Sequence, residues 1–219
     1  MSLEDYVNHF HVRPHKAIII PNGVLIPPFD FKKLTARREK IWQTPRIAWV
    51  GRVSQEKRLD FILKSLAIFS HTSPQARLVM VGDGPYREEA MQYASELSIA
   101  ERIEWVGYRK NVIPFLLKSH LFLHACLSEE FGYTLVEAMT TGLPVIAYDC
   151  PHGPREILDG GRYGILVKTE EEMAQAMREL MKDVEFWREF SSRAFKRARD
   201  FDLRKISEQY RETFRKLLS

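Results

Sequence analysis

The sequence predicts an α/β protein with a doubly wound parallel sheet and a helical tail. Its 219 residues, of which 45% are hydrophobic, suit one large domain with a buried core. Short runs of β-branched residues alternate with helical stretches, which is the pattern of strand–helix–strand units in a parallel sheet. Most of these runs are apolar throughout, as strands covered on both faces are.

Seven apolar runs are predicted as strands, at residues 16 to 20, 46 to 50, 77 to 81, 103 to 106, 120 to 125, 144 to 148 and 164 to 167. Helices are predicted between them, at about residues 57 to 70, 86 to 98, 111 to 118, 133 to 142, 153 to 158 and 171 to 182. The first helix has the clearest signal, because its apolar residues recur at helical spacing: Leu59, Ile62, Leu63, Leu66 and Phe69.

Two more helices are predicted at the end of the chain, at about residues 184 to 200 and 203 to 218. We expect one domain over residues 16 to 202, preceded by a linker or helix at residues 1 to 15. Residues 25 to 45 contain two prolines and a basic run without clean periodicity, so we predict a mobile surface loop there.

Composition and missing motifs exclude several classes of protein. The 28% of charged residues fits a globular chain rather than a disordered one, and no apolar run approaches the roughly 20 residues of a membrane span. The sequence has neither GxGxxG nor GxxxxGK[ST], and no interleaving of basic and aromatic residues. These absences argue against a nicotinamide or flavin enzyme, a P-loop NTPase and a nucleic-acid partner. No histidine spacing indicates a metal site, and we expect none.

Charge and cysteine content indicate a location. Between residues 188 and 216 ten basic residues outnumber five acidic ones, which accounts for the net charge of +4. Such a tail is typical of a solvated helix face, and also of a face turned to anionic lipid. Cys126 and Cys150 each follow an apolar run and are expected to be buried, reduced thiols. We therefore expect a cytoplasmic protein, with any membrane contact being peripheral.

Candidate site residues lie in the strand-to-helix loops, because ligands of open α/β sheets bind beyond the carboxyl ends of the strands. In the loop after residue 50, Gly51 lets the backbone approach a ligand, and Arg52 and Lys57 flank the start of the next helix. Two cations at such a place are typical of a diphosphate site, although the same side chains also occur in solvated loops.

A second loop places carboxylates around another helix start. Glu129 lies in this loop, and Glu137 lies about one turn inside the helix. Gly132 can bring the backbone close to a ligand, and a phosphate would sit at the N–H groups of Tyr133 and Thr134. The carboxylates would then accept hydrogen bonds from hydroxyl groups on either side of it. A nucleotide sugar fits this arrangement; alternatively, the acidic residues of the loop only cap the helix.

The remaining candidates have weaker signals. The loop at residues 150 to 158 is predicted as a structural turn, in which His152 or Arg155 would be the side chain that reaches a ligand. His124 lies within a predicted strand and is interpreted as a core residue. A carboxylate pair is also typical of glycosidases, but nothing in the sequence supplies a second sugar-binding element.

Several motifs together resemble the retaining glycosyltransferases of group 1, also called glycosyltransferase family 4, whose GT-B fold has two Rossmann-like domains. In chain order they are Ile20-Pro21-Asn22-Gly23-Val24, Gly51-Arg52 with Lys57, Val81-Gly82-Asp83-Gly84-Pro85, Val106-Gly107-Tyr108, the E-x7-E pair Glu129 and Glu137, and residues 137 to 147. The resemblance runs from about residue 16 to the end and covers one half of the GT-B fold, the Rossmann-like donor-binding domain. Residues 150 to 158 and 164 to 167 are similar to bacterial members that build surface polysaccharides.

The resemblance implies roles for single residues. Arg52, Lys57 and Glu129 would be catalytic: the two cations would hold the donor diphosphate, and Glu129 would contact the transferred sugar. Glu137 would bind the ribose. Further donor contacts are expected from Gly51, Gly107, Tyr108, Arg109, Phe131, Gly132, Tyr133 and Thr134. The family usually has Gly where this chain has Glu130, which would place a second carboxylate beside the sugar.

The implied reaction is transfer of a sugar from a UDP- or GDP-linked donor to a saccharide or lipid-linked acceptor, with retention at the anomeric carbon. No cofactor or essential metal is expected. The acceptor site of the family belongs to an N-terminal domain, present in cis or in trans, and residues 203 to 219 would pack against it. The chain would then be an excised domain or half of a split enzyme, inactive alone. A nucleotide-sugar epimerase of the same architecture and a noncatalytic nucleotide-sugar-binding module are the alternatives.

Overall fold

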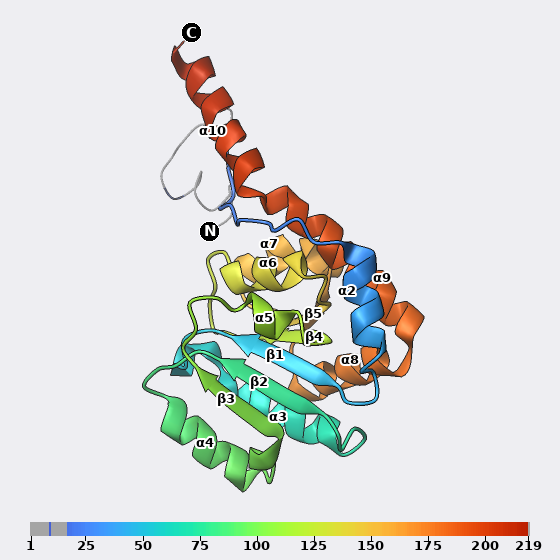
Figure 1. Ribbon diagram of the computed structural model, residues 1–219. Coiled ribbons are helices and arrows are strands. Elements are labelled where there is room, and N and C mark those ends of the chain that lie inside the picture. Colours follow the sequence, from blue (N-terminus) through green and yellow to red (C-terminus); the bar gives the residue numbers. More distant parts are fainter. Residues whose placement is uncertain (1–8, 10–16, 219) are drawn as a thin grey trace.

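A computed structural model describes residue 9 and residues 17 to 218, and its centre is a parallel sheet between layers of helices (Figure 1). The strands are β1 (Arg46–Val50), β2 (Arg77–Val81), β3 (Ile103–Gly107), β4 (Leu121–His124), β5 (Val145–Tyr148) and β6 (Ile165–Val167). They lie in the order β3-β2-β1-β4-β5-β6, and every neighbouring pair is parallel. The predicted doubly wound α/β fold is confirmed, and the order reverses direction between β1 and β4.

Helices cover both faces of the sheet, because successive strand residues point to opposite sides. In β1, Ile47 and Trp49 enter one hydrophobic core, whereas Ala48 and Val50 enter the other. The first core is closed by α3 (Leu59–Ser70), α4 (Arg87–Glu96) and α8 (Glu170–Lys182). The second is closed by α5 (Ile113–Leu116), α6 (Tyr133–Thr140) and α7 (Gly153–Ile157). The chain then continues through α9 (Val184–Ala198), a 3-10 turn η5 (Arg199–Phe201) and α10 (Leu203–Leu218).

The predicted strand at residues 16 to 20 is wrong for the residues that the structure describes. Residues 17 to 20 pair with no strand, and the segment instead runs along the junction of η5 and α10. There the Val24 carbonyl accepts a hydrogen bond from the Leu203 N–H at 3.0 Å. Gly23 permits this approach, because a Cβ on it would lie 2.8 Å from the Leu203 Cα. Residue 16 and the expected linker at residues 1 to 15 lie outside the described residues, apart from residue 9.

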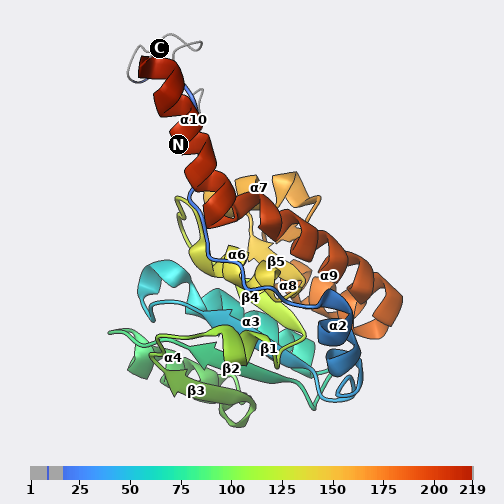
Figure 2. The ribbon, with the colours of Figure 1, turned by 45° about the horizontal axis from the view of Figure 1, so that its top comes forward.

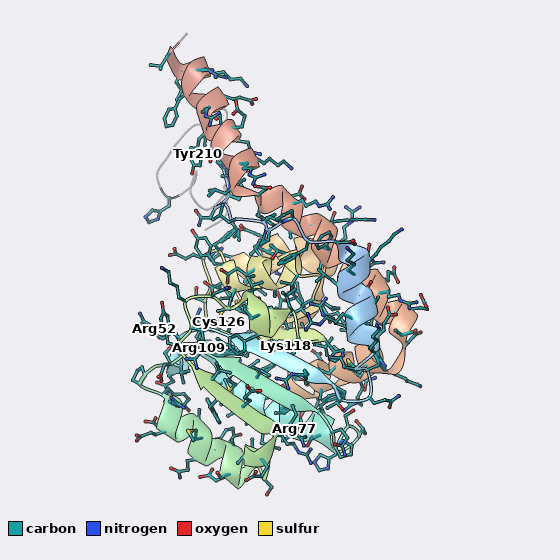
Figure 3. All side chains as sticks on the ribbon, viewed as in Figure 1. Arg52, Arg77, Arg109, Lys118, Cys126 and Tyr210 are labelled. Carbon is teal, nitrogen blue, oxygen red and sulfur yellow. The ribbon has the colours of Figure 1, made fainter. Side chains whose placement is uncertain are left out.

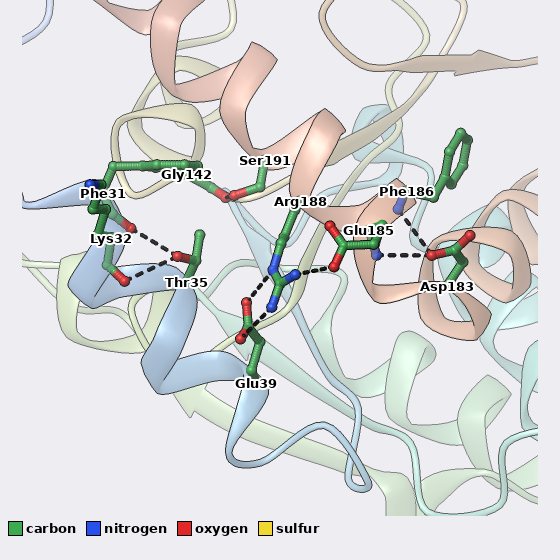
Figure 4. Close-up of polar contacts among 10 residues, drawn as sticks. All are labelled: Phe31, Lys32, Thr35, Glu39, Gly142, Asp183, Glu185, Phe186, Arg188 and Ser191. Atoms are coloured by element: carbon green, nitrogen blue, oxygen red, sulfur yellow. Dashed lines mark hydrogen bonds and ion pairs between the residues drawn. The ribbon is translucent and has the colours of Figure 1, made fainter.

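The predicted surface loop at residues 25 to 45 is also wrong, because α2 (Phe31–Glu39) forms there. The Asp30 carboxylate caps this helix by accepting hydrogen bonds from the N–H groups of its first turn, at 3.0 and 3.3 Å. Helix α2 packs on α9 (Figure 4), where the Arg188 guanidinium donates to both carboxylate oxygens of Glu39 at 2.7 and 2.8 Å. The basic run is therefore part of a packed helix.

Arg38 of α2 is the charge that sequence reasoning placed most wrongly, because its side chain is buried rather than solvated. Its guanidinium donates to the carbonyls of Leu116, Ser119 and Thr141 at 3.3, 2.6 and 2.9 Å. Leu116 ends α5, and Ser119 and Thr141 follow α5 and α6, so all three carbonyls lie near helix C-termini, where the helix dipole is negative. Burial lowers the pKa of Arg38 to about 9, so it stays charged at neutral pH.

Helix α10 extends away from the body of the domain (Figures 1 and 2). Among its described residues only Ile206 is buried. The apolar side chains that remain exposed are Leu203, Tyr210, Phe214, Leu217 and Leu218. In the described part of the chain no helix has the length and apolar content needed to cross a membrane.

Candidate functional site

The candidate site lies beyond the carboxyl ends of β1 and β4, at the point where the strand order reverses. Figure 3 shows Arg52 and Arg109 at this end of the sheet and Arg77 at the opposite end. The loops after β1 and β4 are joined by their backbones, because the Leu127 N–H donates to the Glu56 carbonyl at 2.9 Å. Residues far apart in the sequence are thereby fixed around one space.

Glycines allow the loops after β1 and β2 to touch. Gly82 has a φ of +148°, and a Cβ on it would lie 1.8 Å from the Gly51 carbonyl oxygen. A Cβ on Gly84 would lie 2.3 Å from the Val53 carbonyl oxygen. Any larger residue at these two positions would force the loops apart, so the Gly-Asp-Gly sequence shapes one wall of the site.

Two adjoining cavities occupy this space. The smaller, about 210 Å³, is lined by Trp49, Val50, Gly51, Arg52, Lys57, His124, Ala125, Glu129, Tyr133 and Thr134. The larger, about 450 Å³, is lined by Val50, Gly51, Arg52, Val81, Gly82, Asp83, Tyr108, Arg109, Lys110, Val112, Thr134 and Glu137. Val50, Gly51, Arg52 and Thr134 line both, so the end of β1, the loop after it and the first turn of α6 form the boundary between the cavities.

The smaller cavity holds a chain of three polar groups. Glu129 Oε2 accepts hydrogen bonds from Lys57 Nζ at 2.6 Å and from His124 Nε2 at 3.3 Å. The hydrogen bond from His124 and then that from Lys57 lower the pKa of Glu129 to about 2. Burial lowers the pKa of His124, so the ring is neutral at pH 7. Glu129 is therefore an anion held between a cation and a neutral donor.

The charges next to the larger cavity are less constrained. The Arg52 side chain is exposed and makes no hydrogen bond or ion pair within the described part of the chain. Glu137, on the first turns of α6, is half-buried, and burial raises its pKa. Tyr108 is 72% exposed and faces the same cavity. The Arg52 guanidinium is therefore free to bind an anionic group of a ligand, and the Glu137 carboxylate is free to accept hydrogen bonds from its hydroxyl groups.

The structure separates other expected residues from the two cavities. Gly132 has a φ of +93° and is the N-terminal cap of α6, and Gly107 ends β3 with a φ of +75°. Phe131 packs edge-to-face on Phe201, with ring centroids 5.7 Å apart. Gly107, Phe131 and Gly132 therefore line neither cavity.

Two expectations about neighbouring loop residues are corrected. The acidic residues of this loop do not cap α6, whose cap Gly132 offers no side chain. Glu130 does not place a second carboxylate in the smaller cavity, where the sugar was expected: it lines a separate cavity of about 440 Å³ with Arg197 and Lys205. The two neighbouring residues therefore line different cavities, and Glu129 is the one that contacts His124.

The loop at residues 150 to 158 contacts the backbone of the site and contributes no side chain to either cavity. The Gly153 N–H donates to the Glu129 carbonyl at 2.7 Å, and Arg155 pairs with Asp149 instead of reaching either cavity. Cys126 and Cys150 are buried, free thiols, as expected, with their sulfurs 3.3 Å apart.

Sequence reasoning missed His124, which it interpreted as a core residue. The residue is buried, yet its side chain lines the smaller cavity and contacts Glu129. The available signal was its position: it is the last residue of β4, at the strand end where ligands bind. Trp49, Asp83 and Lys110 were missed as well: Trp49 is the last residue but one of β1, and Asp83 and Lys110 follow β2 and β3 at this edge.

The site and the fold agree with one family. A family model described as glycosyl transferases group 1 matches residues 22–197. Because this match covers most of the chain, the chain belongs to the group 1 glycosyl transferases. The resemblance of the sequence motifs to group 1 glycosyltransferases is thereby confirmed.

Relatives of the chain are longer than it is. An uncharacterized glycosyltransferase of Methanocaldococcus jannaschii is 29% identical over 193 residues, which covers 74% of this chain and 47% of the relative. The N-acetylgalactosamine-N,N'-diacetylbacillosaminyl-diphospho-undecaprenol 4-alpha-N-acetylgalactosaminyltransferase of Campylobacter jejuni is 26% identical over 210 residues, covering 94% of this chain and 55% of the relative. The chain thus spans about half the length of these curated relatives.

Solved structures show the same fold. HepE of Anabaena in complex with UDP matches with a TM-score of 0.83 at 24% identity, over 98% of this chain and 61% of HepE. HepE in complex with UDP-glucose matches with a TM-score of 0.77 at 25% identity, over 93% of this chain and 58% of HepE.

Proposed function

We propose that this chain binds the donor of a retaining glycosyltransferase, a UDP- or GDP-linked sugar. The observation that supports this best is the pair of adjoining cavities that share Arg52. A cation lies between a small cavity with one carboxylate, Glu129, and a larger cavity with another, Glu137. This order matches a ligand with a sugar at one end, a diphosphate in the middle and a nucleoside at the other end.

The diphosphate would lie at the boundary between the cavities. Arg52 is unpaired there, and the N–H groups of Tyr133 and Thr134 begin α6, where the helix dipole favours an anion. Lys57 lines the smaller cavity and would supply a second cation after leaving Glu129. As the bond between the sugar and the diphosphate breaks, these fixed cations would stabilise the negative charge that develops on the leaving group.

The two ends of the donor would be recognised by carboxylates. Glu129 would accept hydrogen bonds from hydroxyl groups of the sugar in the smaller cavity. Glu137 would accept hydrogen bonds from the ribose, and the exposed ring of Tyr108 with Arg109 would lie against the base. HepE, which shares the fold, has been crystallised with UDP and with UDP-glucose.

We propose that the reaction needs no metal ion. His124, Cys126 and Glu129 bring ligand atoms to within 4.8 Å of one another. However, in the ligand-free chain the Lys57 ammonium lies 2.6 Å from Glu129 Oε2 and pairs with this carboxylate. Arg52 and Lys57 carry the positive charge that a divalent ion would otherwise supply to the diphosphate.

The acceptor would be a saccharide or a lipid-linked saccharide in the biosynthesis of a cell-surface glycan. The name of the Campylobacter jejuni relative specifies a diphospho-undecaprenol acceptor, which supports this class. An N-terminal domain would bind the acceptor and cover the exposed apolar side of α10. The basic residues of α10 would let the enzyme work peripherally at the cytoplasmic face of the membrane.

Calorimetric titration of the 219-residue chain with UDP, GDP and ADP tests the donor site. We expect selective binding of UDP or GDP, and loss of that binding in the Arg52→Ala/Lys57→Ala double variant. Glu137→Ala should lower the affinity for the nucleotide by about tenfold, since it removes a charge-assisted hydrogen bond to the ribose. Arg77→Ala, at the opposite end of the sheet, is the control that should bind normally (Figure 3). Failure of the chain to bind either nucleotide would contradict the proposed donor site.

A further inference from the structure

We propose that His124 is the positioning residue of the sugar subsite, holding the Glu129 carboxylate in place while Lys57 exchanges between Glu129 and the donor diphosphate. This inference rests on the proposed function for the identity of the donor. The interaction of His124 with Glu129 is a property of the ligand-free chain, so it can be tested without knowing the donor.

The two partners of Glu129 are attached to the protein in different ways. His124 is the last residue of β4, in the middle of the sheet, and its side chain is 4% exposed. Lys57 ends the short 3-10 turn η2 (Gln55–Lys57), and its flexible four-carbon stem carries a side chain that is 23% exposed. A bound anion can therefore draw Lys57 away from Glu129, whereas the imidazole cannot follow.

The surroundings of the ring determine which nitrogen carries its proton. Nδ1 of His124 is buried and has no hydrogen-bond partner within the described residues. An N–H group buried there without an acceptor would lose its hydrogen bonds to water with no replacement, so the proton belongs on Nε2. Nε2 lies 3.3 Å from Glu129 Oε2 and donates to it. Because burial also keeps the ring neutral, this donor is present throughout the neutral pH range.

The donor complex makes this hold necessary. When Lys57 turns to the diphosphate, Glu129 loses its cation and comes to lie near a second anion in a cavity of about 210 Å³. Repulsion would then rotate the carboxylate out of the cavity unless a fixed donor retained it. The backbone is fixed by the bond from the Gly153 N–H, and His124 fixes the carboxylate itself. The other carboxylate oxygen stays free to accept hydrogen bonds from the sugar.

The ligand-free test is NMR spectroscopy of the isotopically labelled 219-residue chain and two variants. Long-range nitrogen spectra of the histidine rings should show His124 as the neutral tautomer protonated on Nε2. His124→Phe should raise the pKa of the Glu129 carboxyl by about one unit or more, and His124→Gln, whose amide nitrogen can donate in place of Nε2, should largely restore it. A proton on Nδ1, or an unchanged Glu129 pKa in both variants, would overturn the proposal.

The ligand test compares UDP with UDP-glucose and UDP-N-acetylglucosamine by calorimetry. The wild-type chain should bind one of the two donors more tightly than UDP. His124→Phe should lose most of this gain while His124→Gln retains it, and Lys57→Ala should weaken UDP and donor alike by about tenfold. Equal losses for UDP and donor in His124→Phe, or a wild-type chain that gains nothing from either sugar, would overturn the role in the sugar subsite. A chain that binds neither UDP nor GDP would remove the proposed function, while the NMR result still decides whether His124 holds Glu129.

Discussion

At the scale of single residues, the two cations of the site differ in their availability. Arg52 has no partner in the described part of the chain, whereas Lys57 is bound to Glu129 at 2.6 Å. A diphosphate would therefore gain the attraction of Arg52 in full. The attraction of Lys57 would be offset by the cost of breaking its bond to Glu129.

This difference predicts opposite effects for two neighbouring substitutions. Glu129→Gln removes the charge that holds Lys57, so we expect UDP affinity to rise, by up to about tenfold. Lys57→Ala removes a phosphate ligand, and UDP affinity should fall by a similar factor. Calorimetry with UDP measures both effects, with Glu130→Gln as the matched control on the opposite side of the loop. A weaker UDP complex in Glu129→Gln would show that Lys57 does not exchange.

The sequence indicated the charged residues of the site but not their connections. Arg52, Lys57, Glu129 and Glu137 were identified because they follow predicted strands or begin helices. His124 was missed because a histidine within an apolar strand has the pattern of a core residue. Its contact with Glu129 depends on how the loop of residues 125 to 132 closes, and that path is fixed by backbone bonds to other loops.

At the scale of elements, Arg38 ties α2 to the ends of α5 and α6. Arg38→Met should lower the free energy of unfolding by about 3 kcal/mol or more, because three buried carbonyls lose their donor. Arg38→Lys should be intermediate, since an ammonium cannot reach all three carbonyls in the same geometry. The exposed neighbour Arg37 supplies the control, and Arg37→Met should change the stability by less than about 0.5 kcal/mol. Urea unfolding measures all three, and equal stabilities of Arg38→Met and Arg37→Met would contradict this role.

His120 joins the starts of β1 and β4 and makes the stability of the domain depend on pH. Its Nδ1 accepts from the Arg46 N–H at 3.0 Å, and Nε2 donates to the Arg38 carbonyl at 3.2 Å. Burial lowers the pKa of His120 from its ordinary value of 6.5 to about 4. The folded state therefore binds fewer protons than the unfolded state, so this contribution to stability is complete above pH 6.5 and is lost as the pH falls toward 4.

The expected loss over this pH range is roughly 3 kcal/mol for His120 alone. Urea unfolding at a series of pH values measures it. His120→Gln should be less stable at pH 7 and show a flatter dependence between pH 6.5 and 4. Part of the slope should remain, because burial lowers the pKa of His124 in the same direction. An unchanged slope in His120→Gln would contradict this assignment.

Two elements were predicted wrongly because local pattern and tertiary packing disagree. Residues 17 to 20 are apolar enough for a strand, but the sheet offers them no neighbour. Helix α2 carries so many charges that its period is weak, and its stability comes from the cap at Asp30 and from contacts with α9 (Figure 4). The cap was visible in the sequence, whereas the contacts were not.

At the scale of the whole molecule, the strand order explains why the site lies where it does. At the reversal the chain after β1 leads to α3 on one face of the sheet and the chain after β4 leads to α6 on the other face, and the opening between them receives Arg52 from one side and Glu129 from the other. Alternation of strands and helices predicted a doubly wound sheet and therefore this end of the strands. The pairing of β1 with β4, which brings residues 51 to 57 beside residues 125 to 134, follows from long-range packing and was beyond a reading of local patterns.

The packed part of the domain ends within α10. We therefore expect substitutions in the first turn of this helix to change the free energy of unfolding far more than substitutions in its outer turns. Ile206 is buried beside Gly23: a Cβ added to Gly23 would lie 3.3 Å from the Cβ of Ile206. Phe214, about two turns further along the helix, is 59% exposed. Ile206→Ala should lower the free energy of unfolding by about 2 to 4 kcal/mol, and Phe214→Ala should change it by less than about 0.5 kcal/mol. Both variants can be compared by urea unfolding at equal protein concentration. A large loss in Phe214→Ala would mean that the outer turns of α10 are covered in solution, either by residues outside the described part of the chain or by a second copy, and a dependence on protein concentration would identify the second copy.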